Sequence, residues 1–414
     1  MPRFTEIRRR GGFLLIQSIW YSVLKHNRLY KKKNKVFKAG ETIVIEAVVR
    51  DVLNQEIETE IINPFNIPIF NTKTVAKSNS GRIMIKFHTT EVFFPGEYRV
   101  IFSFSRRITK SDSFILENPT AVSKQVILEN FFIIKNNSWS PVFDIRMDFI
   151  LPKHIQGSQE IKQIRIYGNY QRRITDFEDN TWVRTRVGKL EYKENVKVGY
   201  YAVLRLKQNV LSNSEPLKIA HIDTEKRYLK SEPHIETDHQ EIRKICRKID
   251  KVSKSIREFI INSENWIHAN IKYRELNDEK GAKFAIERRY GDCTEFSALF
   301  VALCRCKGIP ARLVGGYGYS ATKKIWEPHA WAECYLNEQW ITIEPTWRTH
   351  FGIIGYTPDR IATIYGNWMS NRVTKDFTIT YKIRKSSKAT TRKPLEISNK
   401  VNILLITKEA NKKP

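Results

Sequence analysis

The sequence predicts a multidomain protein in which two antiparallel β-sandwich domains precede an α+β core. The chain has 414 residues, of which 41% are hydrophobic and 12% aromatic, so it is globular and has room for two to four domains. Strand-like alternation of apolar and polar residues fills much of the first 228 residues. Helical periodicity begins only after a short polar segment that ends near residue 234. The chain therefore divides into an all-β part and a later mixed part.

The first segment, residues 1–38, is strongly basic, with 11 Lys and Arg against one acid. Its stretch RRRGGFLLIQSIWYSVL has the basic start and apolar run of a signal peptide. However, Gln17 and Ser18 interrupt the run, no small-residue cleavage site follows, and the run is too short to span a bilayer. We expect a first β-strand or a peripheral segment here.

Residues 39–118 are expected to form a small antiparallel sandwich. Turn residues such as Pro95 and Gly96 separate alternating stretches that include ETIVIEAVVRDV, GRIMIKFHT and GEYRVIFSFS. The motif FKAGETIVIEAVV, followed by FFPGEYRVIFSF, is similar to the immunoglobulin-like modules of macroglobulin-type proteins.

Residues 119–228 again have the pattern of strands and are expected to form a second β domain. The strand-like stretches are QVILENFFII, FDIRMDFIL, KQIRIYGNY and YYAVLRLKQNV. A linker through Ser231, Glu232 and Pro233 then leads into the core, residues 229–370. The first helices of the core are predicted to share one apolar side, formed by Ile242, Ile245, Ile249, Ile256, Phe259 and Ile260.

A longer buried helix is predicted to begin at Cys293. Apolar residues recur at three- and four-residue steps from Phe296 to Cys304, which gives about four turns before Gly308 and Pro310 stop the helix. Asp292 is a favoured N-cap residue and Glu295 lies three residues further on, so a capping box is expected.

Cys293 would then be the first helical residue, at the positive end of the helix dipole, which favours the thiolate. Arg288 and Arg289 could add to this bias. A cysteine near a helix is more often a packing residue, because free cysteine is among the most buried residue types. A catalytic role requires a base and a group that orients it.

Both partners are predicted downstream, in IWEPHAWAECYLNEQWITIEPTW. This stretch is expected to form two antiparallel strands, Ala330–Leu336 and Trp340–Ile343, joined by a short polar turn. His329 precedes the first strand and Glu344 follows the second, so the two side chains would meet at the open end of the hairpin.

The segments GDCTEFSALFVALCRCKGIPARLVGGY, HAWAECYL and WITIEPTW resemble the three characteristic blocks of the transglutaminase-like superfamily, whose fold is related to that of papain-type cysteine proteases. The resemblance covers roughly residues 230–370 and implies catalytic roles for three residues. Cys293 would be the nucleophile, His329 the general base and acid, and Glu344 the group that orients the imidazole. The family usually has Asp at this third place, which puts the rate in question more than the role.

Two further residues are assigned secondary roles. Related proteins carry an aromatic residue at the place of Trp266, which is expected either to pack in the core or to donate to the oxyanion. Asp292 is expected to support the helix start, whose backbone N–H groups would stabilise a tetrahedral oxyanion formed on Cys293.

The predicted function is thiol-dependent acyl chemistry on amide or peptide bonds through a thioester. Water as acceptor would make the protein a cysteine peptidase or amidase, and a lysine or small amine would make it a protein-glutamine acyltransferase. Four tryptophans near the base either form a channel that limits water or simply pack: Trp326, Trp331, Trp340 and Trp347. The alternative is a catalytically weak or inactive scaffold that binds proteins.

The charge of the chain suggests contact with anionic surfaces. The formal net charge is +27, of which residues 1–38 and the basic C-terminal segment of strands or tail, residues 371–414, supply 19. Such ends are more often solvated. Because no helix-turn-helix, zinc-finger or single-strand-binding signature accompanies them, nucleic acid is not expected as the main partner. The expected partner is a protein or peptide substrate, and the oligomeric state is left open.

The five cysteines do not indicate a metal site or a disulfide framework. Their number is odd and no Cys-x-x-Cys pair occurs: they are Cys246, Cys293, Cys304, Cys306 and Cys334. No metal and no cofactor is expected. So few cysteines in a chain of this length favour the reducing cytoplasm over secretion, with peripheral membrane contact left open.

Overall fold

The fold is given by a computed structural model. In it the chain forms two compact units. The structure describes residues 15–50, 54, 56–64, 68–75, 80–89, 96–104, 107–117, 123–212, 215–220, 223–320, 323–370, 377–383 and 393–406. The first unit comprises residues 1–120 together with Arg348–Phe351, and the second comprises the rest. Parts of the basic ends, including residues 8–14 of the stretch considered above as a signal peptide, lie outside the described residues.

The first unit is a sandwich of two sheets, as predicted for this region. One sheet has the order β2-β1-β4-β7 and is antiparallel, with strands β1 (Leu15–Lys25), β2 (Arg28–Lys31), β4 (Thr42–Arg50) and β7 (Ser80–His88). The other has the order β3-β9-β8-β5-β6, with strands β3 (Val36–Lys38), β5 (Glu56–Ile62), β6 (Pro68–Val75), β8 (Gly96–Phe104) and β9 (Arg107–Glu117). Part of the basic N-terminal segment is thus a first strand, and its inward side chains Tyr21 and Val23 are buried.

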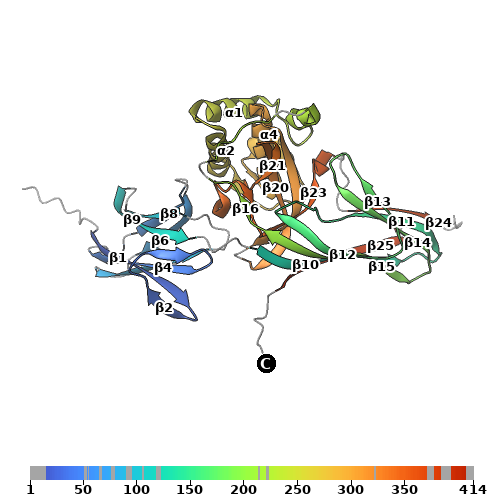
Figure 1. Ribbon diagram of the computed structural model, residues 1–414, viewed down its shortest axis with the longest axis horizontal. Helices are drawn as coiled ribbons and strands as arrows, with labels where there is room; N and C mark the ends of the chain where they lie inside the picture. The colour runs from blue at the N-terminus through green and yellow to red at the C-terminus, as the bar shows by residue number, and fades with distance from the viewer. Residues whose placement is uncertain are drawn as a thin grey trace, which may run out of the picture. The chain divides into compact units, whose positions relative to one another are not determined.

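The second unit contains another sandwich, and its strands come from two distant parts of the chain (Figure 1). One sheet has the order β12-β15-β10-β25, with β10 (Ser123–Asn136), β12 (Gln159–Tyr167), β15 (Asn195–Lys207) and β25 (Leu395–Ile406). The other has the order β13-β14-β11-β24, with β11 (Val142–Ile150), β13 (Tyr170–Thr175), β14 (Thr181–Leu190) and β24 (Phe377–Ile383). Strands β24 and β25, which the sequence analysis placed in a separate terminal segment, therefore complete the second β domain.

The α/β core lies in the chain between β15 and β24. Its central antiparallel sheet has the order β21-β20-β19-β23, with β19 (Ala311–Ser320), β20 (Ile325–Leu336), β21 (Gln339–Ile343) and β23 (Arg360–Tyr365). Short pairs join β16 (Asn209–Val210) to β22 (Gly355–Tyr356) and β17 (Lys272–Tyr273) to β18 (Tyr290–Gly291). The helices are α1 (Gln240–Val252), α2 (Ile256–Asn270), α3 (Gly281–Arg288) and α4 (Cys293–Lys307), with 3-10 turns at Asp223–Leu229, Arg348–His350 and Trp368–Ser370.

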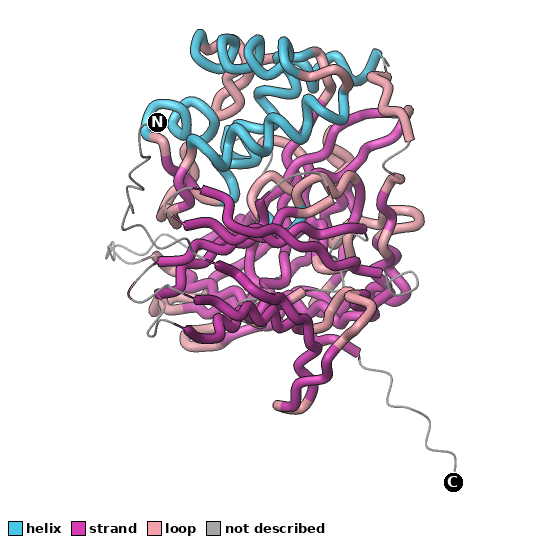
Figure 2. The backbone as a smooth tube through the Cα atoms, turned by 90° about the vertical axis from the view of Figure 1, so that its left-hand side faces the viewer, coloured by secondary structure: helices cyan, strands magenta, loops and turns pink. Residues whose placement is uncertain are grey.

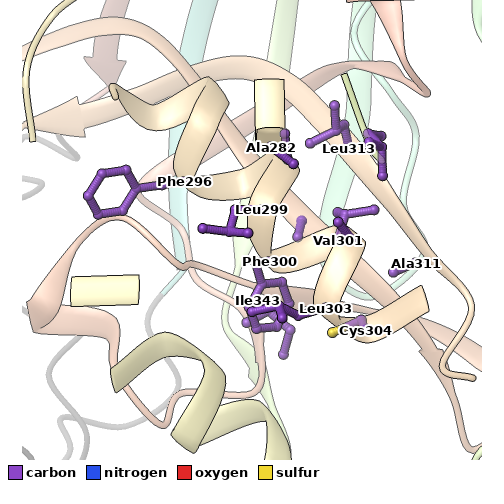
Figure 3. Packing of buried hydrophobic residues seen from close by; sticks show 14 of the residues in the cluster. Ala282, Phe296, Leu299, Phe300, Val301, Leu303, Cys304, Ala311, Leu313 and Ile343 are labelled. Carbon is purple, nitrogen blue, oxygen red and sulfur yellow. The ribbon is translucent and has the colours of Figure 1, made fainter. Parts of the chain in front are cut away.

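The four helices lie close together (Figure 2). Helix α4 has the most buried side chains of the four. Its side chains from Thr294 to Arg305 are all buried, because the other helices and the central sheet surround it. Leu299, Phe300 and Leu303 pack in one cluster with Ile343 of β21 (Figure 3). This packing fixes the start of α4 relative to the β20–β21 hairpin.

The course of β25 predicts that the C-terminal strands are needed for stability. Strand β25 pairs with β10 from Gln125 to Asn136, and its buried Leu395 packs into the core of the second sandwich. We expect removal of residues 377–414 to expose part of that core and to lower the thermal unfolding midpoint by about 5–10 °C. Differential scanning calorimetry measures the shift. Lys400→Ala, an exposed position on the same strand, serves as the control, and an unchanged midpoint in the truncated chain would contradict the expectation.

Candidate active site

Helix α4 begins at Cys293, as predicted, and a capping box holds its first turn. Asp292 has an extended backbone, and its Oδ1 accepts the N–H of Thr294 at 2.9 Å. Glu295 Oε2 accepts the N–H of Asp292 at 3.0 Å. A Cβ at Gly291 would lie 2.4 Å from Cβ of Glu295, so the box requires glycine there. Cys293 is half-buried, and its sulfur lies at the positive end of the helix dipole.

Glu295 also joins this helix start to the loop before α3. Its Oε1 accepts the N–H groups of Lys280 at 2.7 Å and Gly281 at 3.2 Å. Burial raises the pKa of Glu295 to about 7, although these N–H donors act in the opposite direction. The side chain is therefore a buried structural anchor and not a solvated acid.

The hairpin brings His329 and Glu344 together. Asn337 and Glu338 both have positive φ, which is the geometry of a tight two-residue turn, and Leu336 pairs with Gln339 on either side of it. Strand β20 begins earlier than predicted, at Ile325, so His329 lies within it. His329 Nε2 is 2.9 Å from Glu344 Oε2, and both side chains are almost fully buried.

The imidazole also reaches the nucleophile candidate. Burial alone would lower the pKa of His329, but the charge of Glu344 and the hydrogen bonds with Cys293 and Glu344 outweigh it and raise the pKa to about 10. Because Nε2 faces Glu344, Nδ1 is the ring nitrogen left for the sulfur. The protonated ring thus bridges the thiol and the carboxylate, which are 51 positions apart in the sequence.

Backbone donors hold the other oxygen of Glu344. Its Oε1 accepts the N–H groups of Thr346 at 2.9 Å and Trp347 at 3.3 Å. The carboxylate is therefore oriented from both sides. Although Glu is one methylene longer than the Asp usual in the resembling family, it reaches the imidazole at normal hydrogen-bond distance.

Aromatic side chains cover the imidazole. The ring of Trp347 stacks on that of His329, with centroids 4.1 Å apart and planes at 12°, and the buried Trp331 lies at 6.0 Å. A Cβ at Gly318 would lie 2.5 Å from Trp347 and 3.1 Å from His329, so only glycine leaves room for this stack. Trp340 instead contacts Tyr228, and Trp326 contacts Tyr319. The four tryptophans therefore do not form one wall.

Two buried residues at the site were not identified from the sequence. Arg360, 1% exposed at the start of β23, places Nη1 3.3 Å from Glu344 Oε2. Glu264 of α2 is 1% exposed and is near enough to Glu344 for the two charges to interact. The sequence gives little signal for either residue, because Glu264 lies between Ser263 and Asn265 and Arg360 follows Asp359, so both resemble ordinary solvated charges.

The two secondary residues occupy different surroundings. Asp292 is the helix cap described above, and Thr294 donates to it, whereas the cap does not use the N–H of Cys293. Trp266 of α2 is half-buried, packs against the main core cluster and has the guanidinium of Arg289 5.6 Å from its ring centroid. Its role as an oxyanion donor stays a prediction.

All five cysteines are free thiols in the structure. Within the described parts of the chain, no three His, Cys, Asp or Glu side chains are arranged to hold a metal ion. The same parts contain no helix with the length and apolar character that crossing a membrane would require.

Comparison with known proteins finds similarity in the part of the chain that carries these residues. Residues 243–345 match the transglutaminase-like superfamily. The uncharacterized protein YebA of Bacillus subtilis is 33% identical over 111 residues, which are 23% of this chain. The aligned part is only 15% of that relative's length.

A crystal structure of a "putative cysteine protease" from Cytophaga hutchinsonii has a similar fold. It superposes with a TM-score of 0.51 at 16% identity over 70% of this chain and 93% of its own. The predicted family resemblance and the β-rich, multidomain architecture are thus confirmed. Residues 243–345 form a transglutaminase-like domain within the longer chain.

Proposed function

We propose that the protein is a cysteine peptidase or amidase in which Cys293 is the nucleophile, His329 the general acid and base, and Glu344 the orienting carboxylate. The proposal is carried by the contacts of the His329 imidazole, which hydrogen-bonds to both the sulfur of Cys293 and the carboxylate of Glu344. Cys293 is half-buried, whereas Cys246, Cys304 and Cys334 are buried. A scaffold that only binds proteins has no use for a protonated imidazole beside a thiol.

The first chemical step follows from the arrangement of Cys293, His329 and Glu344. The thiolate of Cys293 attacks the carbonyl carbon, a C–S bond forms, and the carbonyl oxygen becomes an oxyanion. The N–H of Cys293, which the cap does not use, is the helix-start donor in reach of that oxygen. As the C–N bond breaks, His329 gives its proton to the leaving amine, and a thioester remains.

The second step removes the acyl group. Neutral His329 takes a proton from the incoming acceptor, which then attacks the thioester and frees Cys293. With water as acceptor the product is a carboxylic acid. The cysteine protease description of the Cytophaga structure supports water. Transfer to an amine would give an amide instead, through the same thioester.

An iodoacetamide probe tests for the activated thiol. Cys306 is also half-buried, and a hydrogen bond with Cys246 together with the charges of Arg243 and Arg247 lowers its pKa to about 7, so Cys306 must be removed first. In a Cys306→Ala background we expect rapid labelling of Cys293 at pH 7, mapped by peptide mass spectrometry. His329→Ala should slow this labelling at least about tenfold.

His268, whose ring contacts the carbonyl of Pro345, provides the matched control for that experiment. His268→Ala should keep the rapid labelling. Equal, slow labelling of Cys293 with and without His329 would remove the proposed function and favour the scaffold alternative.

The charge of Glu344 sets the pH range of this reactivity. Glu344→Gln removes the charge that raises the pKa of His329, and burial then lowers the pKa, so the ring is neutral near pH 7. Because the wild-type pKa is about 10, above the usual 6.5, the wild-type ring stays protonated as pH rises to about 10. We expect rapid labelling of Cys293 that depends on His329 to persist up to about pH 10 in the wild type, and to be lost at neutral pH in Glu344→Gln.

The matched variant is Glu344→Asp, which keeps the charge and shortens the side chain. Its labelling rate at pH 7 should stay within about tenfold of wild type, whereas Glu344→Gln should lose about 10²-fold or more. The measurement is the rate of Cys293 labelling in each protein at each pH. Identical pH profiles for wild type and Glu344→Gln would contradict the assigned role.

Product analysis distinguishes hydrolysis from transfer. A glutamine-containing peptide library is incubated with the protein, with and without a primary amine, and products are identified by mass. We expect cleaved or deamidated peptide in both samples, absent in Cys293→Ala. Amine conjugates in place of hydrolysed product would replace the peptidase assignment with acyl transfer.

A further inference from the structure

An open cavity lies at one end of the second sandwich, and none of its residues belongs to the candidate active site. Its volume is about 630 Å³, and it is lined by Lys135, Asn137, Tyr192, Lys193 and Lys393. These residues come from three parts of the chain: the end of β10 with the turn after it, the turn between β14 and β15, and the segment before β25. A cavity of roughly 300–1,000 Å³ is large enough for a small organic ligand.

A buried asparagine holds the three segments together. Asn136 has no exposed surface; its Nδ2 donates to the carbonyl of Leu190 at 2.9 Å, and its own backbone carbonyl accepts the N–H of Lys193 at 2.9 Å. The N–H of Asn137 donates to the carbonyl of Pro394 at 2.9 Å, which fixes the segment before β25. The lining is therefore held by hydrogen bonds within the protein, and a ligand meets a preorganised site.

The charge of the lining favours an anionic ligand. The lining contains three lysines and no acid. The acids of the same segments have other partners: Glu191 pairs with Lys189, and Glu194 accepts the N–H of Glu191 at 2.8 Å. Glu396 accepts the side-chain amide of Asn137 at 2.7 Å. Ammonium groups around one cavity repel one another, and an anion placed among them offsets that repulsion.

An aromatic pair extends the site beyond the lysines. The ring of Tyr192, in the cavity wall, has its centroid 4.5 Å from that of Trp139, with the planes at 32°. Trp139 is 77% exposed, so much of its indole surface is open to a ligand. The face of an aromatic ring carries partial negative charge, and the C–H groups of a sugar ring, which carry partial positive charge, pack against it. A simple anion would make no use of this indole.

We propose that this cavity binds an acidic saccharide, whose carboxylate or sulfate groups contact the three lysines while a sugar ring packs on Trp139. The hydroxyl groups of the sugar match the remaining hydrogen-bonding capacity of the lysines and of Asn137. The site is separate from Cys293 and its partners, and the inference does not depend on the acyl chemistry. It gives the second β domain a binding role of its own.

Binding of a heparin-derived tetrasaccharide to the full chain tests this inference. Isothermal titration calorimetry at about 0.15 M salt measures the Kd, since this salt screens unspecific attraction to the basic chain. We expect Trp139→Ala and Lys193→Met each to raise the Kd about tenfold. A neutral tetrasaccharide of glucose should bind at least about tenfold more weakly than the acidic one. Lack of measurable binding at about 1 mM acidic tetrasaccharide overturns the inference.

Two exposed residues elsewhere provide matched controls. Trp20, in the first unit, is 38% exposed, and Lys400 is an exposed residue of β25 that does not line the cavity. Trp20→Ala and Lys400→Met should keep the Kd of the parent protein. An equal loss in the controls would show that the net charge of the chain, and not this cavity, binds the probe, and would overturn the assigned site.

Two further probes test the class of ligand. Inorganic sulfate should bind more weakly than the tetrasaccharide and show no dependence on Trp139. An oligothymidylate of similar charge should also bind more weakly. Tighter binding of either probe at the same residues would replace the saccharide and overturn the proposed ligand class. Failure of the proposed function is distinct, because it appears in the labelling of Cys293, which these variants leave unchanged.

Discussion

The geometry of the site depends on one buried ion pair, between His329 and Glu344. Each partner lowers the free energy of the charged form of the other in a region that burial would otherwise make unfavourable for both. Such a pair tolerates little displacement, because a buried charge that loses its partner is strongly destabilising. Gly318, the backbone donors that follow Glu344 and the stacked Trp347 all restrict the position of one partner or the other. They are best understood as consequences of this constraint.

Cys293, the third residue of the site, is positioned by hydrophobic packing and not by charge. Cys293 begins α4, whose apolar side chains interlock with those of β21 through Phe300, Leu303 and Ile343 (Figure 3). Displacement of α4 along its axis would open cavities in this cluster, and buried cavities cost about 1 kcal/mol or more for each methylene lost. The packing of the core therefore fixes the start of α4 relative to the β20–β21 hairpin. Hydrophobic packing positions the sulfur, and electrostatics positions the ring.

Sequence patterns were sufficient for the parts of the site that are local. The capping box at Asp292 and Glu295 spans four residues, and the β20–β21 hairpin closes over a two-residue turn, so both can be inferred from neighbouring residue types. Arg360 reaches Glu344 only because β23 pairs with β19 in one register, and strand register between distant segments is not a local property. The same reason applies to β25, which pairs with β10 across more than 250 residues. A strand pattern shows that a segment is a strand, but it does not show which sheet the strand enters.

The position of β23 also explains why the second β domain and the core form one compact unit. Strand β23 is an edge of the core sheet, and an open edge leaves backbone groups unpaired. Side chains of the sandwich meet this edge: Gln159 bonds to both the N–H and the carbonyl of Ala362, and Asn180 does the same at Tyr365. The sandwich therefore closes the edge that carries Arg360, and through Arg360 it supports the carboxylate that orients the imidazole. The second β domain thus helps to hold the site residues in place, in addition to any part it has in recognition.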